Sequence, residues 1–343
     1  MSFFPTTGML RSQGAEQSSW HERAANGISS EFGRNVFIRG VVEISNFCRE
    51  NCSYCGMRRD NRTLDRLRAE LDVLAELLLQ HRPAAITDIN IQAGEDPVAV
   101  REVALPLVKL LRRETSLGVS VCLGTLSSGL YGQLRAAGAD IYILKFEIAN
   151  PTSYAAMQAP GAHAERLAHI RLLADTGWHV SSGFIAGLPG QNDSDLLENF
   201  HLAQRLPLDG CSVSPFIPGE ETPLRGTCTG DIELTLNCMA ALRLMRPDWV
   251  IPAVSALNLA DATEGYRRGL RTGANLVTIN LTPSALRDNY LIYKRDRFIM
   301  TEERILSAIE AEGLIPSVQG LVSFYSSRRA RKLPRSVAEP AAA

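Results

Sequence analysis

Short apolar runs rich in β-branched residues recur along most of the chain, and stretches with helical spacing of apolar positions follow them. The strand-like runs lie at 36–44, 85–92, 119–122, 141–146, 179–185, 210–216, 249–253 and 275–279. The helix-like stretches lie at 64–79, 98–113, 127–137, 164–176, 193–205, 232–245, 261–272 and 301–312. Eight such units over about 250 residues predict an α/β protein with a (βα)8 TIM-type barrel, with a doubly wound open sheet as the alternative.

The two ends of the chain lack this pattern. Residues 1–34 show no sustained apolar period beyond a short helical stretch near Trp20, and they predict a short N-terminal extension before a barrel domain at 35–318. Residues 319–343 carry a cluster of basic side chains followed by Pro340 and several alanines. We expect a disordered, solvated tail there rather than an arm that binds nucleic acid.

Composition narrows the classes of function. The chain has 343 residues, of which 45% are hydrophobic and 21% charged, and its formal net charge is −1. This balance gives no general attraction to nucleic acid or to an anionic membrane. No apolar run approaches the roughly 18 residues that span a bilayer, and the N-terminus lacks a basic-then-apolar signal. We therefore expect a cytoplasmic protein with neither nucleic acid nor membrane as partner, in which clustered cysteines bind metal.

Three of the seven cysteines lie on one loop directly after the first predicted strand, as Cys48, Cys52 and Cys55 with C-x3-C-x2-C spacing. Three thiolates do not complete a tetrahedral zinc site, and residues 48–61 offer no fourth cysteine or histidine. They can instead bind three irons of a [4Fe–4S] cluster and leave the fourth iron open. The same missing ligand disfavours a fully ligated cluster with an electron-transfer or purely structural role.

Polar residues also follow the other predicted strands, and in a parallel barrel these strand ends meet at one mouth. Gln92 ends the second strand and Glu95 follows it, Lys145 and Glu147 lie where the fourth ends, Ser255 follows the seventh and Asn280 follows the eighth. Lys145 and Glu147 point the same way because they are two residues apart on one strand. The sequence therefore predicts an active site at this mouth.

Three motifs resemble those of radical S-adenosylmethionine (SAM) enzymes over roughly residues 36–318. They are the cysteine triplet with Tyr54 before its last member, Ala93-Gly94-Glu95, and Gly183-x-Ile185-x-Gly187. Within this superfamily, residues 43–61, 94–97, 147–151, 187–191 and 215–218 resemble the branch of biotin synthase, the hydrogenase maturase HydE and methylornithine synthase. Among these, the similarity to HydE is the greatest.

The resemblance implies a cofactor site made of a [4Fe–4S] cluster and SAM. The cysteines would hold the cluster, and Tyr54, Gln92, Ala93, Gly94, Glu95, Glu147, Arg166, Ile185 and Gly187 would contact SAM. By motif position, Glu147 would bind the ribose hydroxyls and Arg166 the SAM carboxylate, which suit a carboxylate and a guanidinium fork. The alternatives are that Glu147 caps the next helix and that Arg166 forms a surface salt bridge.

The same resemblance implies a small amino-acid-like substrate with a carboxylate. Lys145 would bind that carboxylate, and Ser255 and Asn280 would contact the substrate, unless these two side chains merely bond backbone. Carbon-skeleton rearrangement, as in methylornithine synthase, and HydE-like hydrogenase maturation are the competing reactions. A sulfur-donating second cluster is not expected, because Cys122 is displaced from the matching position. The resemblance also implies an electron donor such as flavodoxin or ferredoxin.

Overall fold

The computed structural model describes residues 3–28, 31–295 and 299–332. The strands are β1 (Asn35–Ser45), β2 (Asp88–Ala93), β3 (Gly118–Cys122), β4 (Ile141–Ile143), β5 (His179–Ala186), β6 (Gly210–Pro215), β7 (Leu276–Asn280) and β8 (Ile315–Pro316). The helices are α1 (Thr7–Arg11), α2 (Gly14–Gly27), α3 (Leu71–Gln80), α4 (Pro97–Ala99), the π-helical turn η1 (Val100–Ala104), α5 (Leu105–Glu114), α6 (Ser128–Ala137), α7 (Pro151–Ala156), α8 (His163–Asp175), α9 (Asp193–Arg205), α10 (Ile232–Met245), α11 (Ala256–Ala260), α12 (Gly265–Arg271), α13 (Ser284–Arg287), α14 (Glu302–Ala311) and α15 (Leu321–Lys332).

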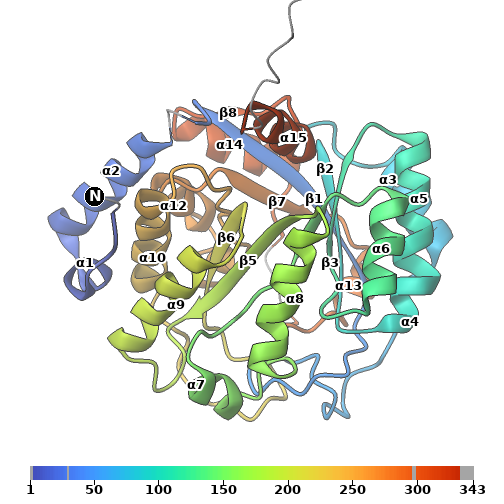
Figure 1. Ribbon diagram of the computed structural model, residues 1–343, viewed down its shortest axis with the longest axis horizontal. Helices are drawn as coiled ribbons and strands as arrows, with labels where there is room; N and C mark the ends of the chain where they lie inside the picture. The colour runs from blue at the N-terminus through green and yellow to red at the C-terminus, as the bar shows by residue number, and fades with distance from the viewer. Residues whose placement is uncertain (1–2, 29–30, 296–298, 333–343) are drawn as a thin grey trace, which may run out of the picture.

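The strands form one curled parallel sheet in the order β6-β5-β4-β3-β2-β1-β7, with β8 paired to the start of β1. Helices such as α3, α5, α6, α8 and α10 surround the sheet (Figure 1). This arrangement confirms the predicted α/β class with a TIM-type barrel. No helix in the described ranges is both long and apolar enough to cross a membrane.

The seventh predicted strand, at 249–253, does not form a regular strand. It makes only isolated parallel bridges, Val250 with Gly210 of β6 and Pro252 with Leu276 of β7. Pro252 has no N–H to donate, so the ladder is interrupted there. The two bridges nevertheless connect the edge strands β6 and β7. The fourth predicted strand is also shorter than expected, since β4 ends at Ile143.

The strand side chains alternate between an apolar exterior and a more polar interior. On β1, Ile38 and Val42 are fully buried in the main core between sheet and helices, whereas Arg39, Val41 and Glu43 line a cavity inside the barrel. The large core therefore lies outside the sheet. Neighbouring side chains of a strand point to opposite faces of the sheet. The more polar set therefore points into the barrel, where it can form a site.

The N-terminal extension is ordered as α1 and α2 within the described residues, and it packs against α10. The amide of Gln17 donates to Glu233 at 2.9 Å and to Asn237 at 3.1 Å. Asn237 in turn donates to the carbonyl of Leu10 at 3.1 Å. These polar contacts attach the extension to the outside of the barrel.

The prediction of a disordered tail from residue 319 is wrong for the first part of that segment. Residues 321–332 form α15, whose Leu321, Phe324 and Tyr325 are buried against residues near the starts of the strands. The basic cluster masked this apolar face in the sequence. Asp88, the first residue of β2, accepts the N–H groups of Leu321 at 2.8 Å and Val322 at 3.4 Å. Residues 333–343 lie outside the described part of the chain.

Candidate active site

The cysteine loop follows β1, and segments from several parts of the chain hold its backbone in place. Arg49 N–H donates to the carbonyl of Glu95 at 3.2 Å, and Ser53 N–H to that of Met157 at 2.9 Å. Gly56 N–H donates to the carbonyl of Ile292 at 3.2 Å. The loop is therefore fixed at the mouth of the barrel, at the carboxyl ends of the strands.

The three loop thiols are free, with Cys52 buried and Cys48 and Cys55 half-buried. Burial, with a contribution from Cys48, raises the pKa of Cys55 to about 12. Burial and the neighbouring thiols also raise the pKa of Cys52 well above its ordinary value. With their pKa values raised, these thiols lose their protons only next to a positive charge, and a bound iron ion would supply that charge.

The donor set fits an iron–sulfur cluster better than a single ion. No three His, Cys, Asp or Glu side chains in the described part of the chain gather closely enough to hold one metal ion. Zinc requires its ligands within about 2.3 Å of one point, whereas each cysteine of a cluster binds a different iron. Cys48, Cys52 and Cys55 would hold such a cluster.

Gly94 and Glu95 lie directly against the cysteine loop. A Cβ on Gly94 would lie 2.2 Å from the carbonyl oxygen of Phe47, so this close approach of β2 to the loop requires glycine. The buried Glu95 carboxylate accepts hydrogen bonds from Arg49 at 3.1 Å, Thr125 at 3.1 Å and Arg166 at 2.7 Å. Ala93, which pairs with Ser45 of β1, precedes them.

Arg166 projects from α8 into this cluster of charges rather than to the surface. It is 6% exposed, and its Nη1 forms an ion pair with Glu95 at 2.7 Å. Its Nε donates to the carbonyl of Lys145 at 2.8 Å. The surface-salt-bridge alternative is therefore wrong, and a role toward the SAM carboxylate stays a prediction.

Glu147 adopts the left-handed region with φ 62°, which is unusual for a residue with a side chain. Its N–H donates to the carbonyl of Gly183, and its carbonyl accepts from Ile185, both at 3.0 Å. The helix-capping alternative is wrong, because the side chain of Asn150 caps α7. Among the described residues the Glu147 carboxylate has no hydrogen bond or ion pair, so it is available to a ligand.

The end of β5 lies beside Tyr54. Buried Ile185 belongs to a small apolar cluster against which Tyr54 packs. The Tyr54 hydroxyl is buried without a hydrogen-bond partner in the described structure, as expected next to a ligand site. Gly187, with φ 84°, donates its N–H to Gln191 at 2.7 Å, and the Gln191 amide donates to the carbonyl of Ile185 at 3.0 Å.

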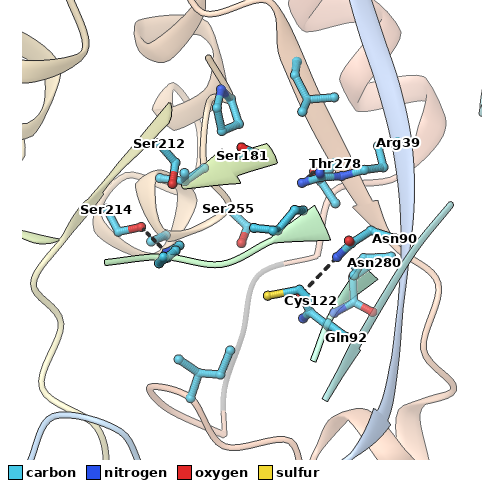
Figure 2. Close-up of a pocket in the computed structure, with 18 of the residues that line it drawn as sticks. Arg39, Asn90, Gln92, Cys122, Ser181, Ser212, Ser214, Ser255, Thr278 and Asn280 are labelled. Carbon is cyan, nitrogen blue, oxygen red and sulfur yellow. Dashed lines mark hydrogen bonds between the residues drawn. The ribbon is translucent and has the colours of Figure 1, made fainter. Parts of the chain in front are cut away.

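A cavity of about 210 Å³ lies inside the barrel. Figure 2 shows polar side chains from several strands pointing into it. Four residues predicted from the sequence line it, namely Gln92, Lys145, Ser255 and Asn280. Asn280 also accepts the N–H of Thr282 at 2.9 Å, which is the backbone contact considered as its alternative role.

Lys145 connects the cavity with the charged cluster. Its Nζ donates to the hydroxyl of Ser214 at 3.0 Å. Burial by itself lowers the pKa of Lys145, but the charges of Glu147 and Tyr293 outweigh burial and raise the pKa above its ordinary value. The ammonium is therefore charged at neutral pH, next to a cavity of suitable size for a small anionic substrate.

Arg39 is a second cation that lines the cavity, and it was not predicted from the sequence. Its Nε is buried without a partner among the described residues, and its Nη2 lies 3.4 Å from the hydroxyl of Thr278. The available signal was an arginine inside a mostly apolar predicted strand, because an arginine is seldom placed there unless it has a partner. Cys122, which the sequence did not predict to form part of a site, also lines this cavity.

Comparison with known proteins agrees with this geometry. The family model of the radical SAM superfamily matches residues 42–203. The HydE subunit of the [FeFe] hydrogenase maturase from Thermotoga maritima is 35% identical over 261 residues, which is 76% of this chain and 74% of that protein. The 3-methylornithine synthase of Methanosarcina barkeri is 26% identical over 296 residues, 84% of this chain and 82% of its own.

Solved structures show the same fold. The crystal structure of methylornithine synthase (PylB) superposes with a TM-score of 0.81 at 21% identity, covering 95% of this chain and 97% of that one.

A third relative by sequence is a biotin synthase from Frankia casuarinae, which is 29% identical over 230 residues, 63% of this chain and 61% of that protein. The chain therefore belongs to the radical SAM superfamily, whose members use a [4Fe–4S] cluster and SAM, and lies in the branch of HydE, methylornithine synthase and biotin synthase.

Proposed function

We propose that this radical SAM enzyme cleaves SAM reductively and abstracts hydrogen from a small amino-acid-like substrate bound in the barrel cavity. The observation that carries the proposal is the position of Lys145. Its ammonium lines the cavity, while its carbonyl accepts a hydrogen bond from Arg166 of the predicted SAM site. One residue thus connects the predicted cofactor site with the predicted substrate site.

When bound, the cluster and SAM together supply a 5′-deoxyadenosyl radical that takes a hydrogen atom from the substrate. The protein's part is to orient both molecules and to exclude water. We assign the ribose hydroxyls to Glu147, whose carboxylate has no partner among the described residues. We assign the methionine end of SAM to Ala93, Gly94 and Glu95, which lie against the cysteine loop, and the adenine to Ile185 and Gly187. Arg166 neutralises the SAM carboxylate.

The cavity favours a small, anionic substrate. Its volume of about 210 Å³ is below the roughly 300–1,000 Å³ of pockets for drug-sized ligands. Lys145 offers a point charge for a carboxylate, and Ser214, Ser255 and Asn280 offer hydrogen-bonding groups. An amino acid meets both requirements, since it is compact and carries a carboxylate.

Two reactions use such a site, and each has one supporting observation. Carbon-skeleton rearrangement is supported by the relative named 3-methylornithine synthase, which matches over 84% of this chain. HydE-like hydrogenase maturation is supported by the higher identity of 35%. We place the rearrangement first because the cavity suits a free amino acid. In either case a cytoplasmic flavodoxin or ferredoxin would deliver the electron.

Anaerobic reconstitution with iron and sulfide, followed by reduction in the presence of SAM, tests the proposal. We expect 5′-deoxyadenosine from the wild type and none from Cys52→Ala. Candidate amino acids in deuterated form would then identify the substrate, because abstraction transfers deuterium to 5′-deoxyadenosine. Equal yields from the wild type and Cys52→Ala would contradict the enzyme assignment, and no label from any amino acid would contradict the substrate class.

A further inference from the structure

Arg66 lies between the cysteine loop and α3, and its guanidinium contacts both ends of the loop. Nη1 donates to the carbonyl of Asn46 at 2.6 Å and to that of Met57 at 2.8 Å. Nη2 donates to the carbonyls of Arg58 at 2.6 Å and Asn61 at 3.2 Å. Asn46 precedes the first cysteine and the other three follow the last. One side chain therefore ties the entry of the loop to its exit.

The charge of Arg66 has no carboxylate partner among the described residues, since all four of its hydrogen bonds go to neutral carbonyls. Burial lowers the pKa of Arg66, and the groups that raise this pKa are Cys48 and Cys55. Because Nη1 contacts the carbonyls of Asn46 and Met57, each two residues from a cysteine, the positive charge lies close to Cys48 and Cys55. Arg49 and Arg68 differ in this respect, because Arg49 pairs with Glu95 and Arg68 with Asp96.

We propose that Arg66 is a positioning residue that closes the cysteine loop around the cluster and raises the reduction potential of that cluster. The proposal rests on the cluster being bound by Cys48, Cys52 and Cys55. An unneutralised cation beside the thiolates stabilises the reduced cluster, which carries one more negative charge. The planar fork is needed for four carbonyls at once, and a lysine ammonium cannot match it.

Two variants separate the effect of the four hydrogen bonds, which hold the loop closed, from the effect of the positive charge. Arg66→Gln removes the charge and most of the hydrogen bonds, whereas Arg66→Lys keeps the charge but loses the fork. Arg62→Gln is the matched control, because Arg62 is an exposed arginine of the same segment with no hydrogen bond or ion pair in the described structure. All variants are reconstituted with iron and sulfide, and folding is followed by circular dichroism and thermal unfolding.

The readouts are iron release to a chelator and the midpoint potential of the cluster, measured by redox titration with electron paramagnetic resonance. We expect Arg66→Gln to release iron about tenfold faster and to have a more negative potential than the wild type. Arg66→Lys should release iron faster at a nearly unchanged potential. Arg62→Gln should match the wild type in both.

An Arg66→Gln protein with wild-type potential and iron release would overturn the proposal. If that variant folds but holds no cluster while Arg66→Lys holds one, the role of the positive charge is supported and the role of the guanidinium fork is wrong. If both variants unfold globally, Arg66 supports the fold as a whole and the specific role is wrong. Formation of 5′-deoxyadenosine by the wild type is scored separately, so its failure would contradict the proposed function without changing the Arg66 result.

Discussion

Glu147 combines a strained backbone with a carboxylate that has no partner among the described residues. A left-handed conformation costs a residue with a Cβ about 1–2 kcal/mol, and such strain clusters at ligand sites. The bridge between Glu147 and Phe184 of β5 holds the backbone in this conformation. The strain has a function if it points the carboxylate at SAM.

We therefore expect Glu147→Gly to raise the free energy of unfolding by about 1 kcal/mol while weakening SAM binding about tenfold. The first quantity is measured by chemical denaturation and the second by titration of the reconstituted enzyme with SAM. Gln158→Gly is the matched control, since exposed Gln158 also has a positive φ of 49°. It should gain stability with unchanged SAM affinity. Unchanged affinity in Glu147→Gly would remove this residue from the site.

Lys145→Ala should still cleave SAM but lose deuterium transfer from the substrate, because the carboxylate loses its counter-charge. Since the pKa of Lys145 is raised, the charge and the stability it contributes are fully present below the ordinary pKa of 10.5 and are lost as pH rises through the folded value. Substrate affinity should therefore not fall between neutral pH and about pH 9 on account of this residue. Ser214→Ala, which removes only the 3.0 Å hydrogen bond, should have a milder effect. Full label transfer by Lys145→Ala would contradict the assignment.

Arg166 and Glu95 form a buried pair that must be considered when either residue is mutated. Arg166→Gln leaves the Glu95 carboxylate, which is 7% exposed, without one of its arginine partners. We expect this change to lower the free energy of unfolding by roughly 3–5 kcal/mol. Glu95→Gln in the same protein should restore part of that loss, as measured in a double-mutant cycle. Simple additivity of the two losses would show that the pair is not coupled.

At the scale of elements, α15 is tied to the barrel through Asp248. Arg328 lies 2.5 Å from the Asp248 carboxylate and Arg246 lies 3.0 Å from it. Burial alone would raise the pKa of Asp248, but the hydrogen bonds and charges of these two arginines lower it to about 2. The ion pair of Arg328 with Asp248 thus attaches a helix that apolar patterning did not reveal.

Because this pKa is depressed, the stabilising effect is present above the ordinary value of 3.8 and is lost as pH falls through about 2. Asp248→Asn should be less stable than the wild type at neutral pH and should lose less stability between these two pH values. Denaturation midpoints across that range measure both effects. Parallel pH profiles of the two proteins would show that the ion pairs do not stabilise the fold.

The sequence predicted the barrel class because strand runs and helical stretches alternate over most of the chain. It predicted too regular a strand at 249–253, where Pro252 interrupts the ladder, and it missed α15, whose buried Phe324 and Tyr325 stand next to a basic cluster. At the site, motif spacing identified the loop and strand-end residues. Contacts such as Arg166 with Glu95, 71 positions apart, depend on the packing of α8 and have no local signature.

At the scale of the whole molecule, the two ends of the barrel differ. The cysteine loop and the charged cluster lie at the carboxyl ends of the strands. At the opposite end, α15 covers the strand starts, and Figure 1 shows α15 and α7 at opposite sides of the molecule. Leu321 and Tyr325 of α15 line the cavity and are almost fully buried. Within the described residues, α15 therefore covers the cavity at this end.

A covered end imposes an order on binding. If the substrate reaches the cavity past the cysteine loop, SAM bound at that mouth lies across its path, so the substrate must enter first. Preincubation with SAM should then slow the first turnover in a rapid-mixing experiment, whereas preincubation with substrate should not. Equal first-turnover rates would indicate another entrance. The helix that was expected to be a loose tail would thus decide the kinetic sequence of the enzyme.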